Sequence, residues 1–246
     1  MSRVNQLKDT LFVGDRKGAD IYGRVFVVSA FGGITNLLLE HKKSGEPGVY
    51  AHLANASNDH GWHEALTRVS AEMQRVHREV LEHPGDIEQA DAFVSERTHG
   101  ARNCLIDLQR LCAYGHFRLS EHMLQIRELL SGLGEAHSAF VTTIMLQRAG
   151  VNARFVDLSG WRDEGNVTLD ERIAQAMEGI DPQTEMPIVT GYAQCAEGLM
   201  REFDRGYSEV TFSKLAALTG AREAIIHKEF HLSSCDPKLV GEHAVK

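Results

Sequence analysis

The feature that most constrains the fold is a continuous apolar run, Gly23-Arg-Val-Phe-Val-Val-Ser-Ala30, which is rich in β-branched residues. Such a run is typical of a strand buried on both faces of a parallel sheet. Gly32 and Gly33 break the strand, and residues 34–41 have the apolar spacing of a helix. The chain thus contains a strand, a glycine turn and a helix in succession, and ligands of parallel-sheet folds gather at the carboxyl ends of such strands.

Later segments repeat this alternation. Strands are predicted over residues 151–158 and 186–190, a helix over 208–218, and a further buried strand over 224–226. Strands that are apolar throughout and alternate with helices favour a mostly parallel sheet covered on both faces. The predicted fold class is therefore α/β, a three-layer αβα sandwich.

Residues from about 60 to 150 are predicted to form a long helical insert. Breaks in its apolar spacing are expected at His83-Pro84-Gly85, at Gly115 and at Gly132-Leu-Gly134. The last of these breaks would start a new helix at Glu135, running to Gln147.

Charge and composition exclude several classes of function. The 26 Lys and Arg residues against 34 Asp and Glu give a net charge of −8, so we expect neither nucleic acid nor an anionic membrane as a partner. No apolar run is expected to span a bilayer, and the polar start of the chain does not resemble a signal peptide, so the cytoplasm is the expected location. The four cysteines form no C-x-x-C pair and are expected to be reduced.

Three segments place polar side chains beside glycine turns that open helices. They are Ser29-Ala-Phe-Gly-Gly-Ile-Thr35-Asn36, Gly134-Glu135-Ala-His-Ser138 and Arg205-Gly-Tyr-Ser208-Glu209. Backbone N–H groups and a helix dipole suit a bound anion, an Arg can grip a carboxylate, and a Glu can hold an ammonium group. Helix capping explains each segment equally well when it is taken alone.

Together, the three segments resemble the aspartokinases of the amino-acid kinase superfamily. That family has V-V-S-A-x-x-G-x-T-N-x-L, then G-E-x-x-S, then V-T-G-F and G-R-G-G-S-D-x-T. This chain has, in the same order, Val27-Val28-Ser29-Ala30-Phe-Gly-Gly33-Ile-Thr35-Asn36-Leu37, Gly134-Glu135-Ala-His-Ser138, Val189-Thr190-Gly191-Tyr192 and Asp204-Arg205-Gly206-Tyr207-Ser208-Glu209-Val-Thr211. Residues 224–240 are similar to the family's nucleotide segment, T-D-V-x-G-x-Y-T-x-D-P-R-x-V. The long helical insert and the sequences that begin at Gly206 and at His227 are most similar to those of the aspartokinases of ectoine-producing bacteria.

The resemblance implies ATP-dependent phosphorylation of the side-chain carboxylate of L-aspartate, with Mg²⁺ bound alongside the nucleotide. It implies an aspartate site made of Ser29, Thr35, Glu135, Arg205 and Ser208. It assigns Glu209 a catalytic role, in which the carboxylate orients a lysine near the phosphates. Its nucleotide-binding residues would be His227, Lys228, Ser233, Asp236 and Lys238. Members of the family are commonly homodimers.

The chain also departs from the family pattern. Glu209 stands where the family has Asp, and Tyr207 where it has a second glycine. The family's K-x-G-G-T-S motif, which cradles the transferred phosphoryl group, is not found, and neither are the C-terminal ACT domains. Residues 1–246 are therefore expected to be a partial amino-acid kinase catalytic domain, and this chain alone is expected to be a poor kinase.

Three alternatives stay open at this point. One is another carboxylate kinase, acting on glutamate or N-acetylglutamate. A second is a non-catalytic remnant that binds an amino acid or a partner. A third is a metal site at Asp59, His60 and His63, or at His227 and His231, although no spacing supplies the three or four convergent ligands that zinc requires.

Overall fold

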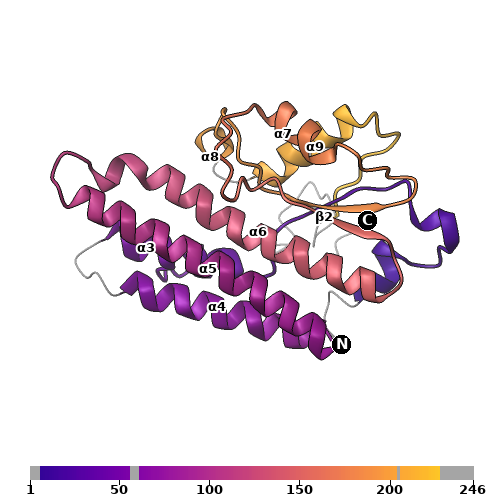
Figure 1. The fold of residues 1–246 in the computed structure, drawn as a ribbon, viewed down its shortest axis with the longest axis horizontal. Coiled ribbons are helices and arrows are strands. Elements are labelled where there is room, and N and C mark those ends of the chain that lie inside the picture. The colour runs from indigo at the N-terminus through magenta and orange to yellow at the C-terminus, as the bar shows by residue number, and fades with distance from the viewer. Residues whose placement is uncertain (1–5, 56–60, 204–205, 228–246) are drawn as a thin grey trace, which may run out of the picture.

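The computed structural model describes residues 6–55, 61–203 and 206–227 of the chain (Figure 1). Its helices and strands, in chain order, are η1 (Lys8–Phe12), η2 (Gly18–Ile21), β1 (Phe26–Val28), α2 (Ile34–Leu38), α3 (Val49–Ala54), α4 (Gly61–Val80), α5 (Pro84–Cys112), η3 (Leu119–His122), α6 (Met123–Arg148), β2 (Ala153–Val156), α7 (Leu169–Met177), β3 (Met186–Thr190), α8 (Leu199–Glu202) and α9 (Tyr207–Leu218).

The three strands form one parallel sheet in the order β1-β3-β2. Ile188 of β3 stands at its centre, opposite Phe26 of β1 on one side and Phe155 of β2 on the other. Parallel strands need helical crossovers, which explains why each strand is separated from the next by helices. The predicted α/β class with a parallel sheet is confirmed.

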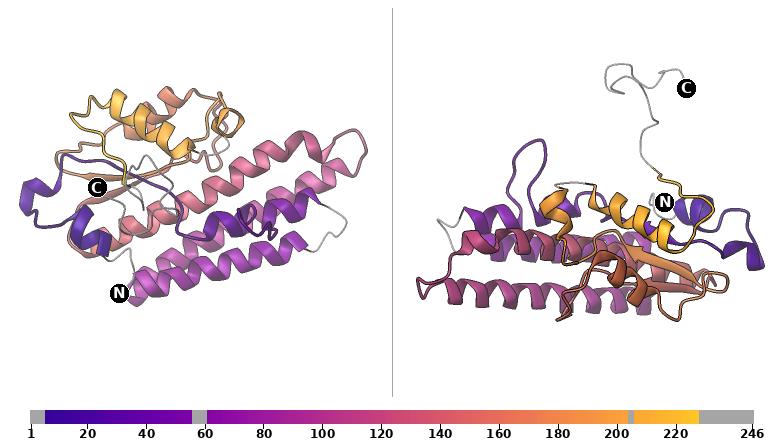
Figure 2. Two further views of the ribbon diagram at one scale, coloured as in Figure 1. Left: turned by 180° about the vertical axis from the view of Figure 1, so that it is seen from behind. Right: turned by 90° about the horizontal axis from the view of Figure 1, so that it is seen from above.

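Helices cover both faces of the sheet because successive strand residues point to opposite sides. On one face, Ile188 and its neighbours pack in one apolar cluster with Ala139 and Val141 of α6. On the other face, Val189 packs in a second cluster with Ile173 of α7 and Leu215 of α9. Figure 1 shows the resulting layers, with α6 between the sheet and the outer helices α4 and α5, and Figure 2 gives the same arrangement from behind and from above.

The long helices largely follow the predicted block, with the expected ends at Pro84 and near Gly115. The predicted break at Gly132-Leu-Gly134 is wrong, because α6 runs unbroken through it. A Cβ atom on Gly134 would lie 2.9 Å from Cδ1 of Leu38, and one on Gly132 would lie 3.0 Å from the ring of Tyr192. These glycines allow other segments to approach the helix closely. That the helices form an insert in a partial catalytic domain stays a prediction.

Two strand predictions need correction. The first strand covers only Phe26–Val28 and is half-buried on both faces, because within the described residues it pairs with β3 alone and its other edge has no neighbouring strand. Residues 224–226 form no strand in the described structure, and Ile225 and Ile226 are 61% and 50% exposed. A short apolar segment becomes a strand only where a partner strand supplies its hydrogen bonds.

The segment Leu119–Arg148, which includes α6, is long and apolar enough by composition to cross a membrane, but 89% of its most apolar window is buried inside the protein. Burial of this kind is what the central helix of a packed core requires. The segment therefore does not by itself indicate a membrane span.

Candidate functional site

Three of the predicted substrate-binding residues are joined by hydrogen bonds, although they come from different parts of the chain. Ser29 follows β1, Glu135 lies in the middle of α6, and Ser208 is the second residue of α9. Ser29 Oγ donates to Ser208 Oγ at 3.2 Å, and Ser208 Oγ donates to Glu135 Oε1 at 3.0 Å. We call Ser29, Glu135 and Ser208 the polar cluster. It lies at the carboxyl end of β1, where parallel-sheet folds bind ligands.

Backbone geometry brings these residues together. Gly206 has φ of +89°, a conformation that favours glycine, and it turns the chain into α9 so that Ser208 falls in the first turn. Gly191 follows β3, and its N–H donates to the carbonyl of Val28 at 3.0 Å. A Cβ atom on Gly191 would lie 2.6 Å from Glu135 Oε2 and 2.7 Å from Ser208 Oγ. The cluster therefore packs directly against the backbone at the end of β3.

Glu135 is buried, with 2% of its surface exposed, so its carboxyl group is costly to ionise. Burial raises the pKa of Glu135 to about 8, and the charge of Glu209 adds to the increase. Ser208, the Tyr192 backbone and the Tyr207 hydroxyl oppose this pKa shift. Glu135 Oε2 nevertheless makes no hydrogen bond of normal length and angle with the described residues. The cluster thus contains a buried acceptor oxygen that an ammonium group would satisfy.

The expectation that Glu135 sits in the first turn of a helix is wrong, since α6 begins at Met123. The N-terminus of its own helix is therefore too far away to act on its carboxylate. The hydroxyl of Ser138 is buried and donates to the backbone carbonyl of Glu135 at 2.9 Å.

The other predicted site residues are not part of the polar cluster. Thr35 is half-buried in α2, and its side chain forms no hydrogen bond to the polar cluster in the described structure. Glu209 is half-buried in the first turn of α9, near enough to affect the pKa of Glu135. His227 is exposed at the end of the described residues. The remaining predictions fall outside the described residues: Arg205, Lys228, Ser233, Asp236 and Lys238.

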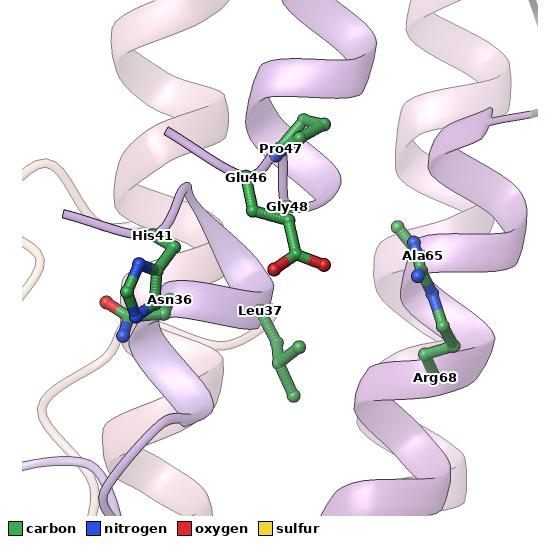
Figure 3. Close-up of a pocket in the computed structure, with 8 residues that line it drawn as sticks. All are labelled: Asn36, Leu37, His41, Glu46, Pro47, Gly48, Ala65 and Arg68. Carbon is green, nitrogen blue, oxygen red and sulfur yellow. The ribbon is translucent and has the colours of Figure 1, made fainter. Parts of the chain in front are cut away.

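A small pocket of about 60 Å³ lies beside α2 (Figure 3). Its lining includes none of the three residues of the polar cluster. Its lining includes Asn36, His41, Glu46 and Arg68. Of the residues in the sequence motifs, it contains Asn36 and Leu37. The buried cluster is the better candidate site because its side chains are joined by hydrogen bonds and leave an acceptor unsatisfied.

The described residues contain no group of three or more His, Cys, Asp or Glu side chains that could hold a metal ion. Of the proposed ligands, His63 lies beside Arg102, whose Nη1 is 3.0 Å from His63 Nδ1. Asp59, His60 and His231 fall outside the described part of the chain.

Sequence reasoning missed a buried histidine pair next to the site. His77 Nδ1 is 2.6 Å from Asp91 Oδ1, and His77 Nε2 is 2.9 Å from His137 Nε2. The Asp91 carboxylate can only accept, so neutral His77 carries its proton on Nδ1 and donates it to Asp91. His77 Nε2 then accepts from the Nε2–H of His137. His137 Nδ1 has no described partner. The ring of His137 also meets Phe31 of the loop after β1, edge to face, at 5.2 Å. Within Gly134-Glu135-Ala-His-Ser138, this histidine carried no signal beyond its place in the motif.

Comparisons with known proteins identify the family of the chain. The chain belongs to the amino acid kinase family, whose sequence pattern matches residues 12–246. It is similar to the aspartate kinase Ask_Ect of Stutzerimonas stutzeri, with 52% identity over 245 residues that cover 100% of this chain and 52% of that protein. It is also similar to an aspartokinase of Schizosaccharomyces pombe, with 28% identity over 134 residues that cover 50% of this chain and 25% of that protein. The chain thus spans at most about half the length of these relatives. No solved structure matches it significantly.

Proposed function

We propose that the protein is an aspartate kinase, which transfers a phosphoryl group from ATP to the side-chain carboxylate of L-aspartate. The observation that carries this proposal is the polar cluster, in which the buried Glu135 carboxylate is hydrogen-bonded to Ser208 and through it to Ser29. The similarity to two aspartate kinases supports the choice of substrate.

L-Aspartate has one ammonium group and two carboxylates, and the proposed site contains a binding group for each of them. Glu135 Oε2, buried and without a described partner, would receive the ammonium group. The hydroxyls of Ser29, Ser208 and Thr35 would orient the side chain that is phosphorylated. Arg205 is proposed to bind a carboxylate, because its guanidinium matches that group bidentately.

ATP would supply the phosphoryl group, with Mg²⁺ bound to its phosphates. We assign the nucleotide to His227, Lys228, Ser233, Asp236 and Lys238 by their resemblance to the family's nucleotide segment. Glu209 is the proposed catalytic residue, at the start of α9 and next to Ser208. Its carboxylate would orient a positively charged group near the phosphates.

The setting of the reaction is also a proposal. The similarity to the ectoine-pathway aspartokinases supports a role in the synthesis of ectoine or of the aspartate-family amino acids. The cytoplasm is the proposed location, and a homodimer the proposed assembly.

Calorimetric binding of L-aspartate, N-acetyl-L-aspartate and L-glutamate to the chain tests the substrate. We expect L-aspartate to bind, and its acetylated form to bind at least about tenfold more weakly, because the acetylated form lacks the ammonium group that Glu135 would hold. Tighter binding of L-glutamate, or of the acetylated compound, would favour another carboxylate kinase. Trapping the acyl phosphate with hydroxylamine, in the presence of Mg-ATP, then tests transfer itself.

A further inference from the structure

The first residue of α9, Tyr207, is a buried tyrosine at a position where the family pattern has glycine. It is 8% exposed, and the left-handed turn at Gly206 directs the chain inward just before it. Its ring meets that of Tyr192 edge to face, with centroids 5.8 Å apart and an interplanar angle of 82°. Tyr192 is itself 1% exposed and packs on α6 at Gly132. The ring of Tyr207 is therefore fixed by packing, which leaves its hydroxyl in a defined place.

That hydroxyl faces two polar side chains of α6. Ser131 and Glu135 are four residues apart and so lie on one face of the helix. Both interact with the Tyr207 hydroxyl closely enough to affect its pKa. Yet Ser131 Oγ and Glu135 Oε2 are both buried without a hydrogen bond of normal length and angle to any described residue. Since buried polar atoms are normally hydrogen-bonded, the three groups form an incomplete set, in which the Tyr207 and Ser131 hydroxyls can donate and the ionised Glu135 carboxylate can only accept.

The chemistry of the surroundings decides where that proton goes. Burial and the charge of Glu135 raise the pKa of Tyr207, so the phenol keeps its proton and can donate it. On the other side of Glu135, Oε1 already accepts from Ser208, and Glu209 of α9 faces the same carboxyl group with a like charge. The backbone of Tyr192 also acts on Glu135, and the charge of Arg127 acts on Tyr207. An ionised carboxylate is a stronger acceptor than a serine hydroxyl, so Glu135 is the preferred partner.

We propose that Tyr207 is a positioning residue of the amino-acid site, which donates its hydroxyl hydrogen to Glu135 Oε2 and so favours the ionised carboxylate that receives the ligand's ammonium group. The proposal rests on the proposed function only in assuming that the ligand carries an ammonium group. It adds a group outside the family pattern to the machinery of the site.

Tyr207→Phe tests the proposal because it removes the hydroxyl and keeps the ring that packs against Tyr192. A lost hydrogen bond to a charged group should raise the pKa of Glu135 by about one pH unit. Binding of L-aspartate should then weaken about tenfold near pH 7, and the difference from wild type should close as the pH approaches about 9.5. Tyr192→Phe is the matched control, since it removes the hydroxyl of the adjacent buried tyrosine and should leave the pH profile of binding unchanged. Weakening by the same factor at every pH would overturn the proposal.

A second measurement needs no ligand and separates this proposal from the proposed function. The ¹³C carboxyl resonance of Glu135, assigned with Glu135→Gln, reports its pKa in the ligand-free protein. This pKa should rise in Tyr207→Phe and rise by less in Ser131→Ala, which keeps the Tyr207 hydroxyl but removes a hydroxyl that can donate to it. If wild type binds no amino acid but these shifts occur, the proposed function fails and the role of Tyr207 stands. An unchanged Glu135 pKa in both variants would overturn that role.

Discussion

At the scale of single residues, Gly191 limits what the site can tolerate. Its φ is not in the left-handed region, so its glycine is required by space and not by backbone conformation. We expect Gly191→Ala to displace Glu135 and Ser208, because the added methyl would lie 2.6 Å from one side chain and 2.7 Å from the other. Overpacking of this kind costs about 1–3 kcal/mol of stability. Binding of L-aspartate should weaken at least about tenfold.

Gly85→Ala is the control for that variant, because Gly85 also has an ordinary φ and its nearest neighbour would be His83 Nδ1 at 3.4 Å. Gly85 lies at the start of α5, far in sequence from the polar cluster, and the change should leave binding unaltered. Chemical denaturation and calorimetry measure the two effects separately. Gly191→Ala protein with wild-type affinity would show that the close approach is unimportant.

At the scale of elements, α6 depends on glycine for packing. Gly134→Ala should favour the helix by about 1 kcal/mol through propensity. The new methyl would, however, crowd Leu38 at 2.9 Å and Ala30 at 3.3 Å, both of them packed in the core. We expect overpacking to prevail and unfolding free energy to fall by about 1 kcal/mol. Denaturant titration beside Gly85→Ala checks this, and a gain in stability would mean that the core has room at this point.

The strand β3 and the helix α6 show what could and what could not be predicted from the sequence. Met186–Thr190 was predicted residue for residue, because an apolar run of this length leaves little choice. The Gly132-Leu-Gly134 break was wrong because two glycines weaken helix propensity while their packing partners, Leu38 and Tyr192, lie far away in the chain. Tertiary contacts of this kind leave no local trace. The motifs indicated Ser29, Glu135 and Ser208. The packing role of Gly191 depends on tertiary contacts and was therefore visible only in three dimensions.

At the scale of the whole molecule, the buried histidine pair links α4, α5 and α6 and makes stability depend on pH. Burial is the main cause that lowers the pKa of His77, and it lowers the pKa of His137 to about 3. The unfolded chain therefore binds protons that the folded protein does not. Stability should be fully present above about pH 6.5 and fall by about 1.4 kcal/mol per pH unit through His137 as the pH drops toward about 3, and the lowered pKa of His77 adds to this fall in the same direction.

His137→Gln isolates this effect, since the amide keeps a donor for His77 but cannot titrate. Its unfolding free energy should depend less steeply on pH between about 4 and 6 than that of wild type. Thermal or urea unfolding across this range measures the slope. Equal slopes in the two proteins would show that His137 takes up its proton in the folded state.

The central claim is that Glu135 holds the ammonium group of an amino acid, and two isosteric variants test it most directly. Glu135→Gln removes the charge from the polar cluster, and Glu128→Gln removes a charge from the same helix two turns earlier, where burial also raises the pKa of the carboxyl group. Calorimetric titration with L-aspartate should show binding weakened roughly thirtyfold or more in Glu135→Gln and little changed in Glu128→Gln. Wild-type affinity in Glu135→Gln, or equal losses in the two variants, would contradict the account.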